Sequence, residues 1–150
     1  MKRKKETWRI VAILAFLAYL LLLAYLLFFS STYGRTIEMG YRYNLTPFLE
    51  IRRGLEHIDT VGLRYVLVNI AGNVVAFMPF GFLLPLISER KMYTVKVLFF
   101  SLLLTVCAES LQLVSRTGAF DVDDLILNTA GGVLGYWCYA LLFGRRRKKE

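Results

Sequence analysis

Polar side chains recur at helical spacing within three long apolar segments of this 150-residue chain. Glu109 carries the most chemistry, because a carboxyl group in a low-dielectric surrounding is held either as a neutral acid or as an ion beside a cation. It belongs to a stripe spaced by four, three and four residues: Thr105, Glu109, Gln112 and Arg116. Amide side chains in such a stripe can donate to a carboxylate and accept from a ligand at the same time. The stripe predicts a polar binding site, or a general acid–base site, centred on Glu109.

Two further stripes complete the candidate site. Asn69 and Asn73 lie four residues apart in an earlier apolar segment, and Asp124 and Asn128 do so in a later one. If these segments cross a membrane in alternating directions, all three stripes reach its outer half. The alternative is that the side chains only join helices, with hydrogen bonds worth about 0.6 kcal/mol each. The predicted ligand-binding residues are Asn69, Asn73, Glu109, Gln112, Arg116, Asp121, Asp123, Asp124 and Asn128, and Glu109 is also the candidate catalytic residue.

The elements that carry these stripes are apolar enough to lie in a membrane. Hydrophobic residues make up 57% of the chain and charged residues 20%, whereas soluble domains contain about half and about a quarter. Four segments approach the roughly 20 residues that cross a bilayer: 10–29, 65–87, 97–114 and 125–143. We therefore predict an all-α integral membrane protein, one domain over residues 1–150, with four transmembrane helices and basic tails at 1–9 and 144–150.

The positions of the basic residues predict the orientation of these helices. The formal net charge is +8, but thirteen of the nineteen Lys and Arg residues lie in three clusters beside apolar segments, at 2–9, 90–96 and 145–149. Such clusters mark cytoplasmic flanks, so this pattern favours a multi-pass plasma membrane protein with both termini in the cytoplasm over a nucleic-acid-binding protein. The six other basic residues fall in the predicted outer loops.

The first outer loop, roughly residues 30–64, is long enough to hold an element of its own. Thr46 and Pro47 resemble an N-cap followed by proline in the first helical turn. After them, apolar residues fall on one helical face, which predicts a short amphipathic helix on the outer leaflet: Phe48, Ile51, Leu55 and Ile58. His57 is the single histidine, so neither a metal site nor a cofactor site is predicted, and we expect this side chain to be solvated.

Two sets of motifs together resemble the VanZ-like membrane proteins over roughly residues 40–140. The first set is the segment 44–48, NLTPF, followed by Asn69, Asn73 and the segment 77–82, FMPFGF. The second set is the segment 109–112, ESLQ, followed by 120–132, FDVDDLILNTAGG, and by Gly135-Tyr136. The polar residues of the family pattern coincide with the candidate site residues given above.

The resemblance implies a bacterial envelope protein linked to resistance to the glycopeptide teicoplanin. It leaves three functions open. The first is a binding module for a membrane lipid or a lipid-linked or acyl-chain envelope component. The second is a small membrane enzyme that uses Glu109 as general acid or base on a lipid head group. The third is a proton-coupled transporter, which polar groups confined to one half of the membrane disfavour.

Overall fold

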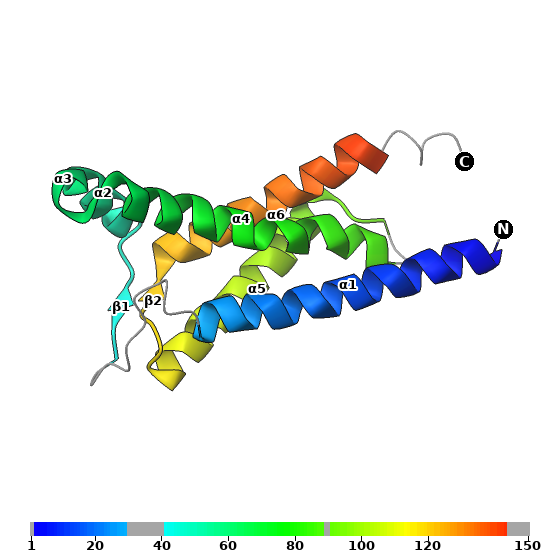
Figure 1. Ribbon diagram of the computed structural model, residues 1–150, viewed down its shortest axis with the longest axis horizontal. Helices are drawn as coiled ribbons and strands as arrows, with labels where there is room; N and C mark the ends of the chain where they lie inside the picture. The colour runs from blue at the N-terminus through cyan, green and yellow to red at the C-terminus, as the bar shows by residue number, and fades with distance from the viewer. Residues whose placement is uncertain (1, 30–40, 89–90, 144–150) are drawn as a thin grey trace.

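Four long helices dominate the computed structural model, which describes residues 2–29, 41–88 and 91–143 (Figure 1). They are α1 (Lys2–Phe28), α4 (Leu63–Ile87), α5 (Thr94–Ser115) and α6 (Val122–Phe143). All four are long and apolar enough to cross a membrane, which confirms the predicted fold class. The predicted bounds hold to within three residues except at the start of α1. That helix begins eight residues earlier, because Lys, Arg and Glu are good helix formers outside the apolar run.

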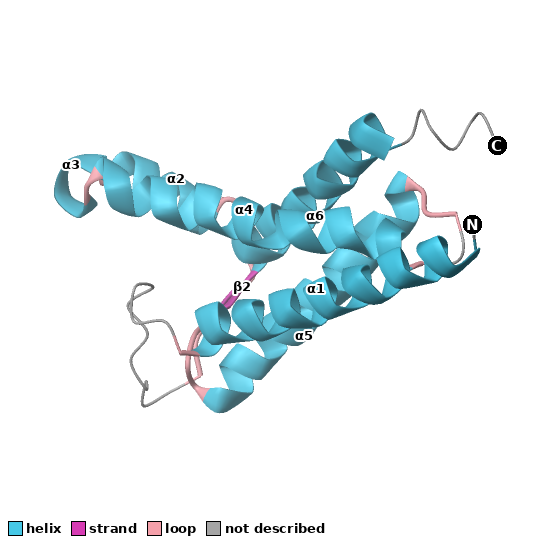
Figure 2. Ribbon diagram, turned by 45° about the vertical axis from the view of Figure 1, so that its right-hand side comes forward, coloured by secondary structure: helices cyan, strands magenta, loops and turns pink. Residues whose placement is uncertain are grey.

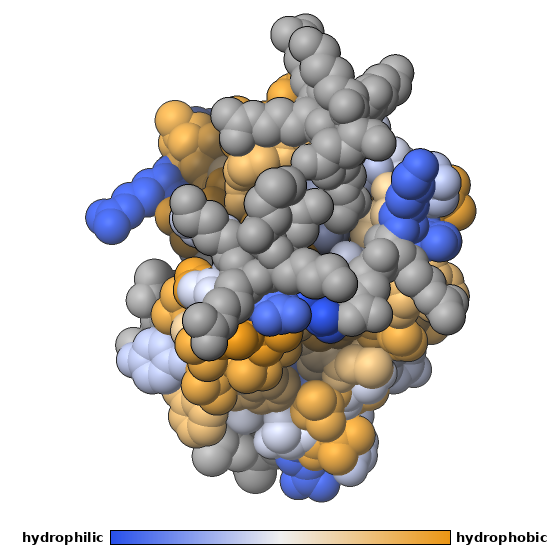
Figure 3. All heavy atoms as spheres, turned by 90° about the vertical axis from the view of Figure 1, so that its right-hand side faces the viewer, coloured by the Kyte–Doolittle hydropathy of each residue, from blue (hydrophilic) through white to orange (hydrophobic). Residues whose placement is uncertain are grey.

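The helices form one bundle in which α4 and α6 are the closest pair, with α5 packed on α6 and α1 packed on α4 (Figures 1 and 2). Lys2 and Phe143 lie at the same end of the bundle (Figure 1). Figure 3 looks onto that end and shows hydrophilic side chains projecting among hydrophobic ones. Large apolar side chains cover the outside of the bundle, Leu21, Val95 and Leu141 among them, as expected of helices that face lipid.

Glycines bring α4 and α6 into backbone contact. A Cβ atom added to Gly81 would overlap the carbonyl oxygen of Gly132, and one added to Gly131 would overlap that of Val74. One added to Gly135 would overlap that of Met78. The glycine spacing in 131–135 predicts that this stripe faces a helix rather than lipid, and the structure confirms that prediction.

Hydrogen bonds of Tyr19 and Gln112 tie the helix α1 to the bundle. The Tyr19 hydroxyl donates to the carbonyl oxygen of Ala76 at 2.9 Å, close to Pro79 in the middle of α4. Pro79 has no N–H to donate to the carbonyl oxygen of Val75, the residue before Ala76. Near the C-terminal end of α1, the Gln112 amide donates to the carbonyl oxygen of Leu27 at 2.9 Å.

The segment before α4 folds across the end of the bundle that lies opposite Lys2 and Phe143 (Figure 1). It contains β1 (Tyr43–Asn44), α2 (Leu49–Glu56) and α3 (Ile58–Val61). The strand β1 pairs in parallel with β2 (Phe120–Asp121), so that Tyr43 faces Phe120 and Asn44 faces Asp121. This pairing joins two loops that are distant in the sequence, and it was not predicted.

The short amphipathic helix is present, but its predicted start is wrong. The helix α2 begins at Leu49, after Phe48 in a left-handed conformation with φ of 63°, and no side chain of its own segment caps it. The Thr46 N–H instead donates to the Asn44 side chain at 3.0 Å. The donors at the start of α2 are satisfied by a carboxylate from α6, as described below, so a local cap is not needed.

Candidate functional site

A cavity of about 860 Å³ lies between the β1–α2 segment on one side and the first turns of α4 and α6 on the other. Its wall combines apolar side chains with acidic, basic and amide groups. Four of the predicted ligand-binding residues line it, namely Asn69, Asp121, Asp123 and Asp124. Other residues of the wall come from the segment before α4, where no binding residue was predicted: Tyr41, Arg42, Tyr43, Asn44, Glu50, Arg53 and His57.

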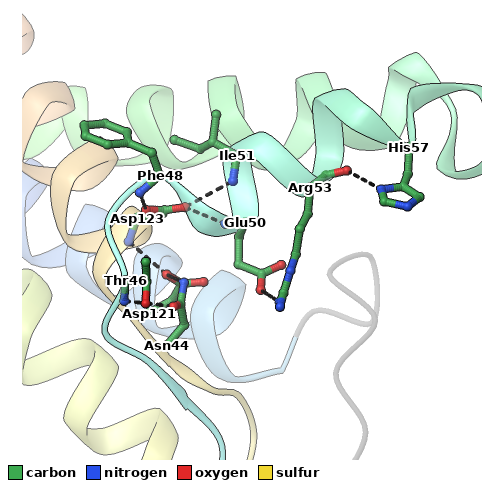
Figure 4. A network of polar contacts seen from close by, with 9 residues as sticks. All are labelled: Asn44, Thr46, Phe48, Glu50, Ile51, Arg53, His57, Asp121 and Asp123. Atoms are coloured by element: carbon green, nitrogen blue, oxygen red, sulfur yellow. Dashed lines mark hydrogen bonds and ion pairs between the residues drawn. The ribbon is translucent and has the colours of Figure 1, made fainter.

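Asp123 caps α2 from a distance (Figure 4). One carboxylate oxygen accepts a hydrogen bond from the Phe48 N–H, and the other accepts from the N–H groups of Glu50 at 2.9 Å and Ile51 at 3.1 Å. The side chain is 2% exposed. A carboxylate at a helix N-terminus satisfies orphan donors and the positive end of the helix dipole. Asp123 therefore builds one wall of the cavity by fixing α2, with its oxygens already engaged.

Asp121 caps the start of α6. Its Oδ1 accepts a hydrogen bond from the Asp123 N–H at 2.8 Å, the pattern of an N-cap, and another from the Asn44 amide at 3.1 Å. Burial raises the pKa of the Asp121 carboxyl group, and the negative charges of Asp123 and Glu50 raise it further. The carboxyl group is half-buried in the cavity wall.

The two asparagines of α4 lie in different surroundings. The Asn73 amide donates to the Asp124 carboxylate, which joins α4 to α6 beside the cavity. Asn69, one turn earlier, is exposed and lines the cavity. Only Asn69 therefore presents its amide to the cavity, although the spacing placed both residues in one stripe.

Glu109 lies beneath the cavity and not in its wall. It is 2% exposed, as predicted for a carboxylate that avoids lipid. Its Oε2 accepts a hydrogen bond from the Asp121 N–H at 3.2 Å. This backbone contact was not predicted, because it depends on how the β2 segment folds back over α5. Glu109 thereby supports the residue whose side chain faces the cavity.

Gln112 and Asn128 join helices. Gln112 reaches α1, as described above, and the Asn128 amide donates to the Thr105 hydroxyl on α5 at 2.9 Å. Both are almost fully buried, and neither lines the cavity. These two residues were predicted to bind a ligand, but the structure shows them in hydrogen bonds between helices, as the alternative interpretation expected.

Arg116 does not reach Glu109. It ends α5 in a left-handed conformation with φ of 57°, and its exposed guanidinium stacks over the Tyr41 ring at 5.1 Å from the centroid. The chain reverses at this residue, so its side chain leaves the helical stripe that the spacing assumed. Within the described residues, no ion pair links Arg116 to Glu109.

Several cavity residues were missed because they belong to the segment that precedes α4. The side chains of Glu50 and Arg53 form an ion pair at 2.6 Å on α2. His57 is exposed, as predicted, yet it lines the cavity, and its Nδ1 lies 3.1 Å from the Arg53 carbonyl oxygen. Their helical spacing predicted an amphipathic surface helix, but nothing in the sequence indicated that α2 folds back over α4 and α6.

Four apolar helices of membrane-spanning length, with a polar cavity at one end, define a small multi-pass membrane protein. The chain belongs to the VanZ/LLP1 family, whose sequence profile matches residues 16–143. It is 32% identical over 126 residues to "Protein VanZ" of Enterococcus faecium. This alignment covers 82% of this chain and 70% of that relative. No solved structure matches the fold.

Proposed function

We propose that this protein binds a lipid-linked or acyl-chain component of the bacterial envelope in the cavity, and that such binding contributes to resistance to teicoplanin-type glycopeptides. The cavity carries the proposal. It combines charged and amide groups with apolar side chains such as Leu49, Ile70 and Leu127, which suits an amphiphile whose polar end needs hydrogen bonds. The cavity lies at the end of the bundle away from Lys2 and Phe143, and cytoplasmic termini would make this the outer end.

Binding is better supported than catalysis. Glu109, the candidate general acid or base, does not line the cavity, and a general acid or base has to reach the proton that it transfers. The carboxylate oxygens of Asp123 are engaged by the backbone of α2. The residues that face the cavity thus supply hydrogen bonds and charge, which are the means by which a binding site recognises a head group.

The proposed orientation puts the cavity outside the plasma membrane. Glu56, on α2, and Lys91, between α4 and α5, are both exposed and lie at opposite ends of α4. Single cysteines at these positions, in a variant that lacks Cys107 and Cys138, should react from opposite sides. An impermeant maleimide applied to intact cells should label Glu56→Cys and spare Lys91→Cys. If only Lys91→Cys is labelled, the topology is the inverse of the one proposed, and the cavity lies on the cytoplasmic side.

Obstructing the cavity tests the proposed binding directly. Asn69 is exposed in its wall, so Asn69→Trp should fill the cavity while leaving the bundle packed. We expect the lipid or lipid-linked component that co-purifies in detergent to fall roughly tenfold by mass spectrometry, as an occluded site loses about 1.4 kcal/mol or more of binding. Val68→Trp is the matched control, because Val68 is exposed on the same turn of α4 and does not line the cavity. Equal co-purification by the two variants contradicts the proposal.

Two substitutions at Glu109 separate binding from proton transfer. Glu109→Gln keeps an oxygen that accepts from the Asp121 N–H but removes the titratable proton. We expect this variant to retain a large part of the co-purifying component, whereas Glu109→Leu leaves that N–H without this acceptor and should lose most of it. The same mass spectrometric assay compares the two. If Glu109→Gln abolishes function while the component remains bound, a proton-transfer role takes the place of simple binding.

A further inference from the structure

One oxygen of the Asp121 carboxyl group is open to the cavity. Within the part of the chain that the structure describes, the Asp121 carboxyl group accepts hydrogen bonds from the Asn44 amide and from the Asp123 N–H, and both end on Oδ1. The side chain is only partly buried and lines the cavity, and neither of these hydrogen bonds uses Oδ2, which leaves that oxygen for a bound molecule. A carboxylate oxygen accepts hydrogen bonds and has none to donate when it is ionised.

Acidic side chains outnumber basic ones in the cavity wall, with Glu50, Asp121, Asp123 and Asp124 against Arg42 and Arg53. Burial raises the pKa of the Asp121 carboxyl group, and the nearby negative charges of Asp123 and Glu50 raise it further. Arg53, the nearby cation on α2, is paired with Glu50 at 2.6 Å. A ligand that brings a positive donor to Oδ2 would relieve this repulsion, whereas an anionic group would add to it.

We infer that the ligand of the cavity carries a protonated amine, and that this ammonium group donates to Oδ2 of Asp121. The inference rests on the proposed function and adds the chemical class of the head group. Tyrosine rings in the same wall, those of Tyr43 and Tyr65, suit a cation, because a cation is attracted to the face of an aromatic ring. A metal cation fits less well, because no group of three or more His, Cys, Asp or Glu side chains is placed to hold one among residues 2–29, 41–88 and 91–143.

Native mass spectrometry of the full chain in detergent tests this inference with two lipids of identical acyl chains. Phosphatidylethanolamine offers an ammonium group and phosphatidylglycerol offers none. We expect phosphatidylethanolamine to bind roughly tenfold more tightly, as charge-assisted hydrogen bonds are about twice as strong as neutral ones. N-acetylation of its amine should bring its affinity to that of phosphatidylglycerol. Soluble glycerophosphoethanolamine should compete if the head group alone is recognised, as for an amine on a larger lipid-linked molecule.

Substitution of the carboxyl group completes the test. Asp121→Asn keeps Oδ1 as an acceptor for Asn44 and for the Asp123 N–H but removes the charge, so the preference for phosphatidylethanolamine should disappear. Asp59→Asn is the control, since Asp59 is an exposed acid of α3 that does not line the cavity. If phosphatidylglycerol or N-acetylated phosphatidylethanolamine binds as tightly as phosphatidylethanolamine, the inference of an amine is wrong. The proposed function would still stand. Binding of none of these lipids, with no co-purifying amphiphile, overturns the proposed function itself.

Discussion

Replacing Gly81 with leucine is expected to separate α4 from α6 and to lower the free energy of unfolding by about 3 kcal/mol or more. Even the first carbon of the new side chain would overlap the backbone carbonyl of Gly132, and a backbone cannot move aside as a flexible side chain can. Gly135→Leu should behave in the same way against the carbonyl of Met78. Thermal unfolding in detergent, monitored by circular dichroism, measures the loss of stability in both variants.

Gly54→Ala is the matched control for these substitutions. A Cβ atom at Gly54 would lie 3.5 Å from a methyl group of Val66, which is an ordinary contact. Gly54 lies within α2, where alanine is favoured over glycine by up to about 1 kcal/mol. This variant should therefore unfold at the same temperature as the unaltered protein or slightly above it. An unchanged melting temperature for Gly81→Leu would contradict the close packing of α4 against α6.

Asp123→Ala should release the first turn of α2 and open the cavity wall. The substitution removes the acceptor of three backbone N–H groups, and the loss of a helix cap costs about 1–2 kcal/mol. We expect faster hydrogen–deuterium exchange over residues 48–56, a lower melting temperature, and loss of the co-purifying component. Asp123→Asn keeps an acceptor oxygen but loses the charge. Its exchange rate and melting temperature should therefore lie between those of Asp123→Ala and those of the unaltered protein.

Asp59→Ala distinguishes this effect from the loss of any acidic residue near a helix start. Asp59 is exposed in the first turn of α3 and belongs to the same segment as α2. Its replacement should leave exchange over residues 48–56 unchanged. If Asp123→Ala and Asp59→Ala exchange alike, the carboxylate of Asp123 does not hold α2.

The four helices were predictable because each depends on its own sequence. An apolar segment of about 20 residues forms a helix in a membrane whatever its neighbours are, since every backbone group must be paired internally. The glycine stripe was predictable for a similar reason, because small residues at 131 and 135 allow close approach by whichever helix lies opposite. Glu109 was expected to be buried because a carboxylate that faces lipid is costly.

The cavity wall could not be predicted because it depends on contacts between distant residues. Helical spacing put Asn69 and Asn73 in one stripe, but the fold of the preceding segment leaves Asn69 facing the cavity and pairs Asn73 with Asp124. Spacing also included Arg116, although α5 ends there with a reversal of the chain. The parallel pairing of β1 with β2 involves two residues from each strand, too short a pattern to recognise in a sequence.

The cap on α2 has a consequence for the order in which the protein is made. Asp123 follows Phe48 by 75 residues, so a ribosome has synthesised α2, α4 and α5 before the carboxylate that completes the first turn of α2 exists. Until α6 enters the membrane, that turn has its donors hydrated or bound elsewhere. The cavity can therefore take its final form only after α6 is inserted, and in a nascent chain that lacks α6 the first turn of α2 is without this cap.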